Sequence, residues 1–320
     1  MKKKIEFLDL GQQPLANYYL DKNQINKKER KYRLIICFDN MSKLVSIKKT
    51  FSSKMMFNNK YPYRSSMSQT MQKSFKDLAQ QIKRKINPKK ILEIGSNDGS
   101  FLKNFHKKIS IGIEPCANVE KITKKQKFNT IPKYWNSKLA KSILKKYGEI
   151  DLIYSANTIS HIKDLNDVFK SIKIVLSPKG VLILEDPSLL ECLKRNTYDQ
   201  FYNEHIYVFS YLSLKAILKK FDLEIYKIQN LDIHGGSNRY FIKKINNKIA
   251  IEKSVVNQQI KEIKYGIDKK STYFKFKRRV ENSKKKLVSI FKFCKSKNKK
   301  IIGYGATAKA TTILNYCKID

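Results

Sequence analysis

Cysteine is scarce and scattered in this sequence of 320 residues. The five cysteines lie far apart in the chain, and no two of them form a C-x-x-C pair: Cys37, Cys116, Cys192, Cys294 and Cys317. This spacing excludes a disulfide framework of the kind found in small secreted proteins, and it shows no local zinc site. We expect reduced, mostly structural thiols.

Long apolar runs are also missing. No stretch approaches the ~18 consecutive apolar residues that indicate a membrane-spanning helix. The N-terminus lacks the apolar core of a secretion signal. These absences predict a cytoplasmic protein without membrane contact, and we favour a monomer.

Acidic residues are few. The chain has 27 Asp and Glu against 67 Lys and Arg, which gives a formal net charge of +40. Such a balance is typical of proteins that bind nucleic acid, because clustered basic side chains release counterions from phosphate backbones. Here the basic residues are mostly lysines spread along the whole chain, alongside abundant Ile and Asn. This pattern indicates the codon bias of an AT-rich genome, so we expect no nucleic-acid partner, although the charge can help to hold an anionic substrate.

The most informative segment is ILEIGSNDGSFL at residues 91–102. Gly95 allows a sharp turn after a short apolar strand, and Gly99 removes a side chain where the next helix packs close to a ligand. The segment matches neither G-x-G-x-x-G nor the P-loop, and Asp98 would repel a pyrophosphate but suits an amino group or a sulfonium. The spacing resembles motif I of class I S-adenosylmethionine (SAM) methyltransferases, with an ordinary strand-to-helix turn as the alternative. It predicts six cofactor-binding residues: Glu93, Gly95, Ser96, Asn97, Asp98 and Gly99.

Strand-like and helix-like patterns alternate after this loop. The expected strands are residues 90–94, 110–113, 129–131, 151–155 and 180–185, with helices at 119–125, 137–146 and 165–176 and a closing hairpin at 223–231 and 239–244. Strict alternation predicts an α/β Rossmann-like fold, a seven-stranded and mostly parallel sheet with helices on both faces. Glu114 ends the second strand about 20 residues after the first, the distance at which such folds place an acid on a ribose diol.

The length exceeds the ~100–200 residues usual for one domain, so we expect more than one unit. We place boundaries near Arg84 and Asn246. This division gives an N-terminal unit (1–84), a SAM-binding unit (85–246), and a lysine-rich helical segment followed by a strand-like start (247–320).

Three of the four histidines lie in segments expected at one edge of the sheet: SANTISHIKD (155–164), YDQFYNEHIYVFS (198–210) and HGGSNR (234–239). His205 has the strongest case as a general base, because a neutral imidazole can accept a proton at working pH and the adjacent Glu204 can orient it. Tyr202 can donate a hydrogen bond to developing negative charge or serve as an alternative base. The fourth histidine, His106, is expected on a helix, in a structural role. The histidine spacings match no common metal-binding motif.

Four segments together resemble a known family. They are LGQQPLANYYL (10–20), EIGSNDGSFL (93–102), YDQFYNEHIYVFS with HGGSNR, and GYGATAKATTILNYC (303–317). The family they resemble is that of the sugar C-methyltransferases, which act on nucleotide-linked 4-keto-6-deoxyhexoses. The resemblance implies SAM-dependent C-methylation, in which a proton next to the ketone is abstracted and the enolate attacks the SAM methyl group.

The resemblance also implies roles for individual residues. His205 would abstract the C3 proton, while Tyr202, His161 and Asn157 would bind or polarise the keto-enolate. Asn157 is also expected beside the cofactor. Glu204 completes the catalytic group. The remaining residues are expected to bind the substrate, with the Arg239 guanidinium suited to a pyrophosphate: Tyr61, Tyr63, Arg64, Ser65, His234 and Arg239.

Two departures from the family stand out. Its members open with cysteine pairs that bind zinc, but no cysteine precedes LGQQPLAN here, and Cys37 is followed at the expected partner position by Asn40. We predict that zinc is lost and that this small α+β unit keeps its role as a lid. At the other end, residues 303–317 should begin a second Rossmann-like lobe, yet the sequence stops at Asp320. A single strand-helix unit cannot bury a core of its own, so either the chain is a fragment or its last helix packs on the preceding helices.

Other functions remain open. An O- or N-methyltransferase acting on another small molecule would share the cofactor loop. A catalytically degenerate SAM-binding protein would account for the lost zinc ligands and the incomplete C-terminal lobe. A nucleic-acid methyltransferase ranks last, because the chain has no N-P-P-Y motif.

Overall fold

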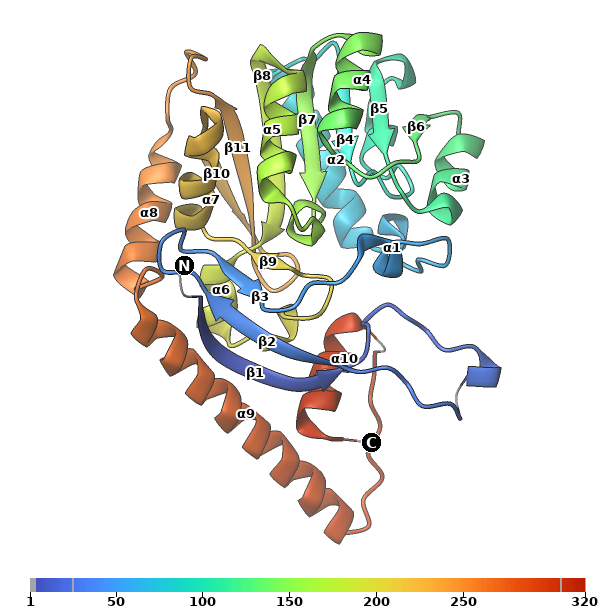
Figure 1. The fold of residues 1–320 in the computed structure, drawn as a ribbon, viewed down its shortest axis with the longest axis vertical. Helices are drawn as coiled ribbons and strands as arrows, with labels where there is room; N and C mark the ends of the chain where they lie inside the picture. The colour runs from blue at the N-terminus through green and yellow to red at the C-terminus, as the bar shows by residue number, and fades with distance from the viewer. Residues whose placement is uncertain (1–3, 25, 306, 320) are drawn as a thin grey trace.

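Two β-sheets organise the chain in the computed structural model, which describes residues 4–24, 26–305 and 307–319. The larger sheet has seven strands in the order β10-β11-β8-β7-β4-β5-β6 (Figure 1). These strands are β4 (Ile91–Ile94), β5 (Ser110–Ile113), β6 (Asn129–Ile131), β7 (Ile150–Ala156), β8 (Leu176–Pro187), β10 (Leu223–Leu231) and β11 (Ser237–Lys244). The pairs from β6 to β8 are parallel, and β11 lies antiparallel between β8 and β10. The sequence prediction of a mostly parallel α/β sheet with a C-terminal hairpin is confirmed.

The strand positions follow the local sequence pattern closely, with one exception. β5, β6 and β10 coincide with the expected ranges. β8 begins at Leu176 and runs through Pro178, whereas the strand was expected to begin at residue 180. Ile150 pairs with Leu176 but Leu152 pairs with Val181, so the extra residues of β8 form an irregularity in the ladder and do not end it.

Helices cover both faces of this sheet. They are α2 (Gln69–Lys85), α3 (Ala117–Lys125), α4 (Ser137–Tyr147), α5 (Leu165–Val175), α7 (Tyr211–Leu218) and α8 (Lys253–Tyr265). On one face α4, α5 and α7 bury Ile143, Phe169 and Leu214 in a shared core. On the other face α2 buries Phe75 and Leu78. Each helix thus presents an apolar stripe to the sheet, as amphipathic helices of doubly wound folds do.

The N-terminal strands form a second, antiparallel sheet in the order β1-β2-β3-β9. Its strands are β1 (Ile5–Gln13), β2 (Tyr32–Phe38), β3 (Val45–Ile47) and β9 (Tyr207–Val208). β9 comes from the segment that follows His205, so the second sheet takes its last strand from the middle of the chain. The core under this sheet also includes side chains of α6 (Leu189–Arg195), such as Leu193.

The C-terminal helices complete the core of this second sheet. α9 (Lys270–Ser296) contributes Tyr273 and Phe276, and α10 (Ala308–Cys317) packs against β1 (Figure 1). The strand expected at the start of the segment 303–317 is wrong, because residues 299–305 form neither helix nor strand; Ala306 lies outside the described residues. Among the described residues, no strand pairs with residues 299–305. The helix that follows, α10, packs on the N-terminal sheet as well as on the preceding helix α9. The boundaries near Arg84 and Asn246 stay a prediction.

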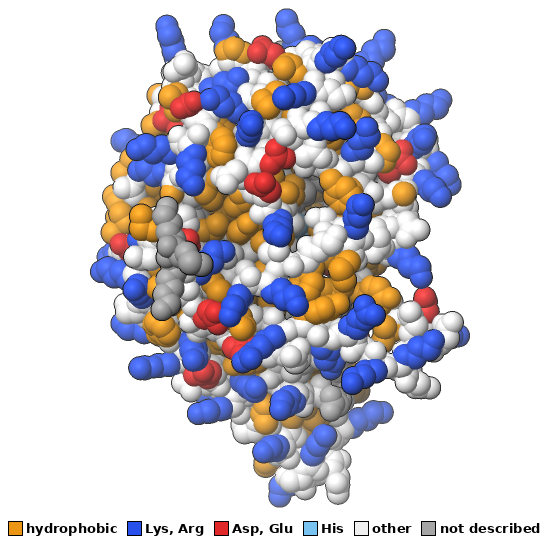
Figure 2. All heavy atoms as spheres, viewed as in Figure 1, with side chains coloured by type: hydrophobic (Ala, Val, Ile, Leu, Met, Phe, Trp, Pro, Cys, Tyr) orange, Lys and Arg blue, Asp and Glu red, His pale blue; other side chains and the backbone are white. Residues whose placement is uncertain are grey.

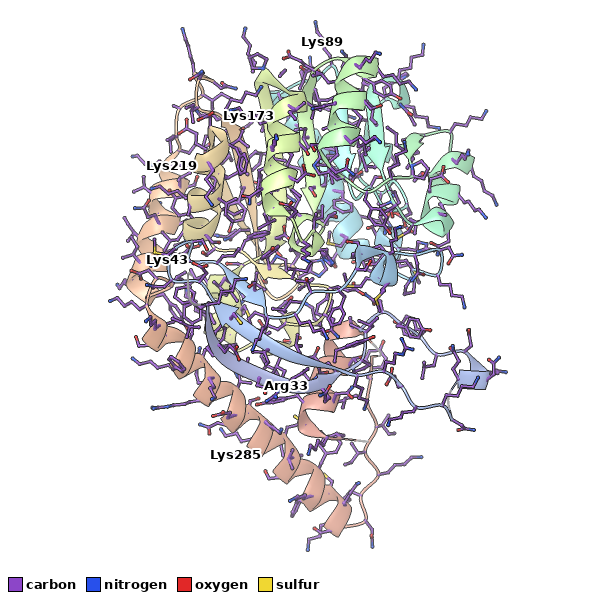
Figure 3. All side chains as sticks on the ribbon, in the orientation of Figure 1. Arg33, Lys43, Lys89, Lys173, Lys219 and Lys285 are labelled. Atoms are coloured by element: carbon purple, nitrogen blue, oxygen red, sulfur yellow. The ribbon has the colours of Figure 1, made fainter. Side chains whose placement is uncertain are left out.

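Basic side chains are spread over the face of the molecule drawn in Figure 2. Figure 2 shows Lys and Arg across the whole visible face, with a few acidic side chains among them. Lys89, Lys173 and Lys285 in Figure 3 project outward from three different parts of the molecule. Within the described ranges, no helix has the length and apolar character needed to cross a membrane.

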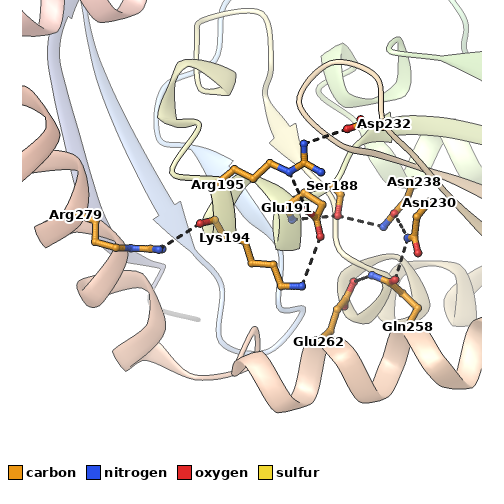
Figure 4. Close-up of polar contacts among 10 residues, drawn as sticks. All are labelled: Ser188, Glu191, Lys194, Arg195, Asn230, Asp232, Asn238, Gln258, Glu262 and Arg279. Carbon is orange, nitrogen blue, oxygen red and sulfur yellow. Dashed lines mark hydrogen bonds and ion pairs between the residues drawn. The ribbon is translucent and has the colours of Figure 1, made fainter.

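A polar network joins α8 to the central sheet (Figure 4). The buried Glu262 carboxylate accepts hydrogen bonds from the backbone N–H groups of Tyr211 and Leu212, at 2.8 and 3.0 Å. It therefore supplies the anionic partner that the first turn of α7 requires. Gln258 donates to Glu262 and accepts from Asn230 of β10. These contacts fix α8, and with it the start of α9, against the sheet.

The Arg239 side chain is buried inside the fold and is not exposed at the surface. Its Nε atom lies 2.8 Å from Glu185 Oε2, and both side chains are almost fully buried. The guanidinium also donates to Gln229 and to Ser74 of α2. The expectation that Arg239 binds a substrate pyrophosphate does not fit this arrangement, because the guanidinium is already occupied between α2 and the sheet.

We predict that Arg239→Met destabilises the protein by roughly 3–5 kcal/mol, because Glu185 is left buried without its charged partner. The measurement is the free energy of unfolding from chemical denaturation. The control is Arg33→Met, which breaks the exposed Arg33–Asp9 ion pair and should have little effect. Equal, small losses in the two variants would contradict the structural role of Arg239.

Candidate functional site

A cavity of about 790 Å³ lies at the carboxyl ends of β4, β5, β7 and β8. This edge is where open α/β sheets bind ligands. Most of the site residues predicted from the sequence line it: Tyr61, Tyr63, Arg64, Ser65, Glu93, Gly95, Asn97, Glu114, Asn157, His161, Tyr202, His205 and His234. Five others do not: Ser96, Asp98, Gly99, Glu204 and Arg239. Residues from positions 17 to 309 thus meet around one space.

The loop after β4 has the backbone that its glycines predict. Gly95 has φ +76°, and a Cβ atom there would overlap the Thr158 side chain. The N–H groups of Gly95 and Ser96 both donate to the carbonyl of Ile113, at 2.9 and 3.0 Å. Any side chain at position 95 would therefore force the loop away from β7, and the floor of the cavity would change shape.

Two buried carboxylates face the cavity from the ends of β4 and β5. Glu93 is 4% exposed, its Oε2 atom has no hydrogen-bond partner, and burial together with Asp98 and Glu114 raises its pKa well above the usual value. Burial also raises the pKa of Glu114, which accepts hydrogen bonds from the N–H groups of Cys116 and Asn97. A cationic ligand bearing hydroxyl groups would complete both environments. SAM, with its sulfonium, amino group and ribose, meets this requirement.

A segment formed by residues 53–68, here called the strap, is bonded to the cofactor loop. The N–H groups of Ser65 and Ser66 donate to Asn97 Oδ1 and Asp98 Oδ2, at 2.9 and 3.0 Å. The other oxygen of Asp98 accepts from Ser100, so this carboxylate holds the strap, and Asp98 does not line the cavity where a ligand would lie. The Asp98 expectation is corrected in this respect.

The same segment continues across the cavity. Asn118 donates to the carbonyl of Tyr61, and Tyr134 donates to the carbonyl of Phe57. The Arg64 guanidinium is held by the carbonyls of Tyr61 and Tyr63. The strap therefore borders the cofactor loop and also extends to His161, whose ring centroid lies 5.4 Å from that of Phe57.

His205 is held on both sides. Its Nδ1 atom lies 2.8 Å from the carbonyl oxygen of Gln200, and its Nε2 atom lies 2.7 Å from the Tyr202 hydroxyl. A carbonyl can only accept, so Nδ1 carries the proton and Nε2 is the acceptor for Tyr202. Burial, aided by His161, lowers the pKa of His205 well below its usual value. The imidazole is therefore neutral, with its basic nitrogen directed at a phenol.

His161 lies beside this pair. Its ring centroid is 4.9 Å from that of His205, in an edge-to-face arrangement. Its Nδ1 atom is buried without a partner, and burial lowers the pKa of His161 to about 4. A second neutral imidazole thus adjoins the first. His106, expected on a helix, instead lies in a loop and caps a 3-10 turn (Lys107–Ile109) away from the cavity.

Glu204 does not orient His205, which corrects the sequence prediction. Both Glu204 carboxylate oxygens lie 2.8 Å from Asn17 Nδ2, and the Gln200 carbonyl takes the place next to His205 that Glu204 was expected to fill. Glu204 lies in a turn in which the His205 N–H group donates to the carbonyl of Tyr202, so the two adjacent side chains are not directed at each other. Burial raises the pKa of Glu204 to about 7.

Three contributors were not assigned from the sequence: Asn17, Gln200 and Lys309. All three lie inside segments that carried the family resemblance: residues 10–20, 198–210 and 303–317. Gln200 acts through a backbone carbonyl, which no sequence pattern reveals. Lys309 is one of 67 Lys and Arg residues, so nothing in the composition distinguishes it from a surface lysine.

We predict that the free energy of unfolding of the Glu204→Gln variant increases relative to that of the unchanged protein as pH rises from about 4.5 to 7. The folded state binds the Glu204 proton more tightly than the unfolded state, so this carboxyl costs stability as it ionises, about 3 kcal/mol in full. Thermal unfolding at pH 5 and pH 8 measures the difference. A pH-independent difference would show that Glu204 keeps an ordinary pKa.

Two families of protein domains match the chain. A family described as "Methyltransferase domain" matches residues 63–228, and one described as "C-methyltransferase C-terminal domain" matches residues 232–320. The curated C-methyltransferase NovU from Streptomyces niveus is 26% identical over 229 residues. These residues are 71% of this chain and 54% of NovU, so the match spans about half the length of that relative.

Solved structures also resemble the chain. One is a SAM-dependent methyltransferase from Thermotoga maritima, described as a possible histamine N-methyltransferase, with 19% identity and a TM-score of 0.40 over 52% of this chain and 88% of that one. Another is the PH0226 protein from Pyrococcus horikoshii, with 16% identity and a TM-score of 0.44 over 57% and 94% of the two chains.

The methyltransferase-domain match covers more than half of the chain, including the loop, both cavity carboxylates and His205. The unpartnered Glu93 oxygen beside the Gly95 turn fits the cofactor of that family. The chain belongs to the SAM-dependent methyltransferases.

Proposed function

We propose that this protein methylates a carbon atom next to the ketone of a nucleotide-linked 4-keto-6-deoxysugar. The observation that carries the proposal is the Tyr202–His205 pair, which lines the same cavity as the cofactor loop. A carbon acid must lose a proton before it can accept a methyl group, so it needs a base, whereas many oxygen and nitrogen acceptors are already nucleophilic. The match of residues 232–320 to a C-methyltransferase domain supports the same choice.

In this proposal the cofactor occupies the end of the cavity below the strap. Glu114 accepts hydrogen bonds from the ribose hydroxyls, and Glu93 balances the positive charge of the ligand. Gly95, Asn97 and Asn157 border the same space. Bound SAM supplies an electrophilic methyl group.

The acceptor lies on the side of Tyr202 and His205. His205 Nε2 is the proton acceptor, and the Gln200 carbonyl stabilises the imidazolium that forms by holding the Nδ1 proton. The Tyr202 hydroxyl moves its hydrogen bond from His205 to the developing enolate oxygen, with His161 and Asn157 nearby. Glu204 acts indirectly. Its carboxylate holds the amide of Asn17, and Asn17 lines the cavity. No metal takes part, and residues 1–84 serve as a lid on the acceptor.

The test is incubation with a nucleotide 4-keto-6-deoxyhexose in deuterated water, with and without SAM. We expect deuterium to enter at C3 without SAM, and a C-methylated sugar to form with it, both detected by mass spectrometry. If neither product forms with protein that binds SAM, the proposed function is wrong.

We predict that His205→Ala lowers methyl transfer and deuterium exchange by about 100-fold or more, the usual range for loss of a general base. SAM affinity should stay nearly unchanged, since the base acts on the acceptor. His106→Ala is the matched control and should leave both reactions intact. Equal loss of SAM binding and turnover in the His205 variant would contradict the assigned role.

We predict that Glu114→Ala weakens SAM binding by about 1–3 kcal/mol, the range for hydrogen bonds to a charged group. Trp135, the one tryptophan in the sequence, lines the cavity and provides an intrinsic fluorescence signal for the titration. Glu149→Ala removes an acidic residue that does not line the cavity and serves as the control. Unchanged affinity in the Glu114 variant would exclude a ribose contact.

A further inference from the structure

We propose that Lys309, His234 and Gln200 form a subsite for the phosphate-bearing part of the acceptor. This inference rests on the proposed function, because it specifies how the same cavity recognises a nucleotide-linked sugar. Lys309 would bind a phosphate oxygen, His234 would donate to the same group, and Gln200 would accept from a sugar hydroxyl. Arg239 cannot take this role, since it is buried against Glu185.

The subsite is built around one carbonyl group. His234 O accepts a hydrogen bond from Gln200 Nε2 and a second one, at 3.4 Å, from Lys309 Nζ. His234 belongs to the turn between β10 and β11, Gln200 to the segment that holds His205, and Lys309 to the first turn of α10. All three residues line the cavity. Three distant parts of the chain are thus fixed relative to one another at its wall.

Two buried atoms at this place lack partners. Gln200 is 2% exposed, and its Oε1 atom makes no hydrogen bond, because its amide nitrogen is committed to the His234 carbonyl. The Nε2 atom of His234 is also buried and unpartnered. An unpaired polar atom inside a protein costs free energy comparable to a lost hydrogen bond, so both atoms indicate a ligand that carries donors and acceptors.

The electrostatics favour an anion. Lys309 is half-buried, and among the described residues no carboxylate lies within ion-pair distance of its ammonium group; Asp199 and the Cys192 thiol act on it only from further away. The N-terminus of α10 adds positive potential, with the Thr307 side chain capping the helix. Burial lowers the pKa of Lys309 and also lowers the pKa of His234 to about 4. A bound phosphate would supply the missing negative charge.

The location also fits a substituent close to the reacting carbon. Lys309 is near enough to His205 to depress the pKa of that imidazole. The other basic side chains of the cavity are Arg64, which the strap carbonyls hold beside the cofactor loop, and the exposed Lys163. Lys309 is therefore the partly buried cation on the acceptor side.

The test compares Lys309→Met with Lys285→Met, which removes an exposed lysine of α9 outside the cavity (Figure 3). Calorimetric titration of the full chain, saturated with S-adenosylhomocysteine, uses thymidine 5′-diphosphate and thymidine as probes. We expect Lys309→Met to weaken diphosphate binding about 10- to 100-fold, as loss of a charge-assisted hydrogen bond predicts. Thymidine binding should not change, and Lys285→Met should behave as the unchanged protein. Lys309→Arg should recover part of the loss.

Binding of the diphosphate is measured without turnover, so the subsite can be judged even if no sugar is methylated. Trp135 fluorescence with SAM verifies that each variant folds. Unchanged diphosphate affinity in Lys309→Met overturns the proposal, as does the absence of diphosphate binding by the unchanged protein. A large fall in kcat with unaltered diphosphate affinity also overturns it, because the ammonium would then act on the enolate.

Discussion

The site depends on the placement of residues 198–208 between the two sheets. β9 pairs with β3 of the N-terminal sheet, while the carbonyl of Phe209 accepts from Leu189 just after β8. The turn that directly precedes these anchors brings the Gln200 carbonyl and the Tyr202 hydroxyl to opposite sides of the His205 ring. The N-terminal sheet therefore helps to hold the Tyr202–His205 pair in place.

Five ionisable groups lie buried in the wall of the cavity or directly behind it. Glu93, Glu114 and Glu204 have raised pKa values, and His161 and His205 have lowered ones, each chiefly through desolvation. Burial therefore favours the neutral form of both the carboxyl groups and the imidazoles. A ligand with a positive sulfonium and an anionic acceptor would bring its own charges to complementary ends of this space. Because the surrounding medium is of low polarity, such interactions are stronger there than in water.

The sequence predicted the parts that depend on local pattern. The apolar period gave the strands and helices of the central sheet, and Gly95 gave the cofactor turn. The sequence prediction failed where a residue far away in the chain determines what a side chain contacts. Arg239 was expected to bind a pyrophosphate, but its guanidinium pairs with Glu185. Glu204 was expected to orient His205, but its carboxylate is bound by Asn17, far away in the sequence. The expected strand before α10 has the right residues, but no neighbouring strand pairs with it.

Asn17 and Glu204 are separated by 187 positions, yet the amide meets both carboxylate oxygens. A buried carboxylate without this donor is costly, and a buried amide without an acceptor is costly too. We therefore expect a substitution at either position to be tolerated only together with a compensating substitution at the other. Exchanging residues 1–84 between relatives would succeed only where this pairing is preserved, so the N-terminal unit and the segment around Glu204 constrain each other's sequence.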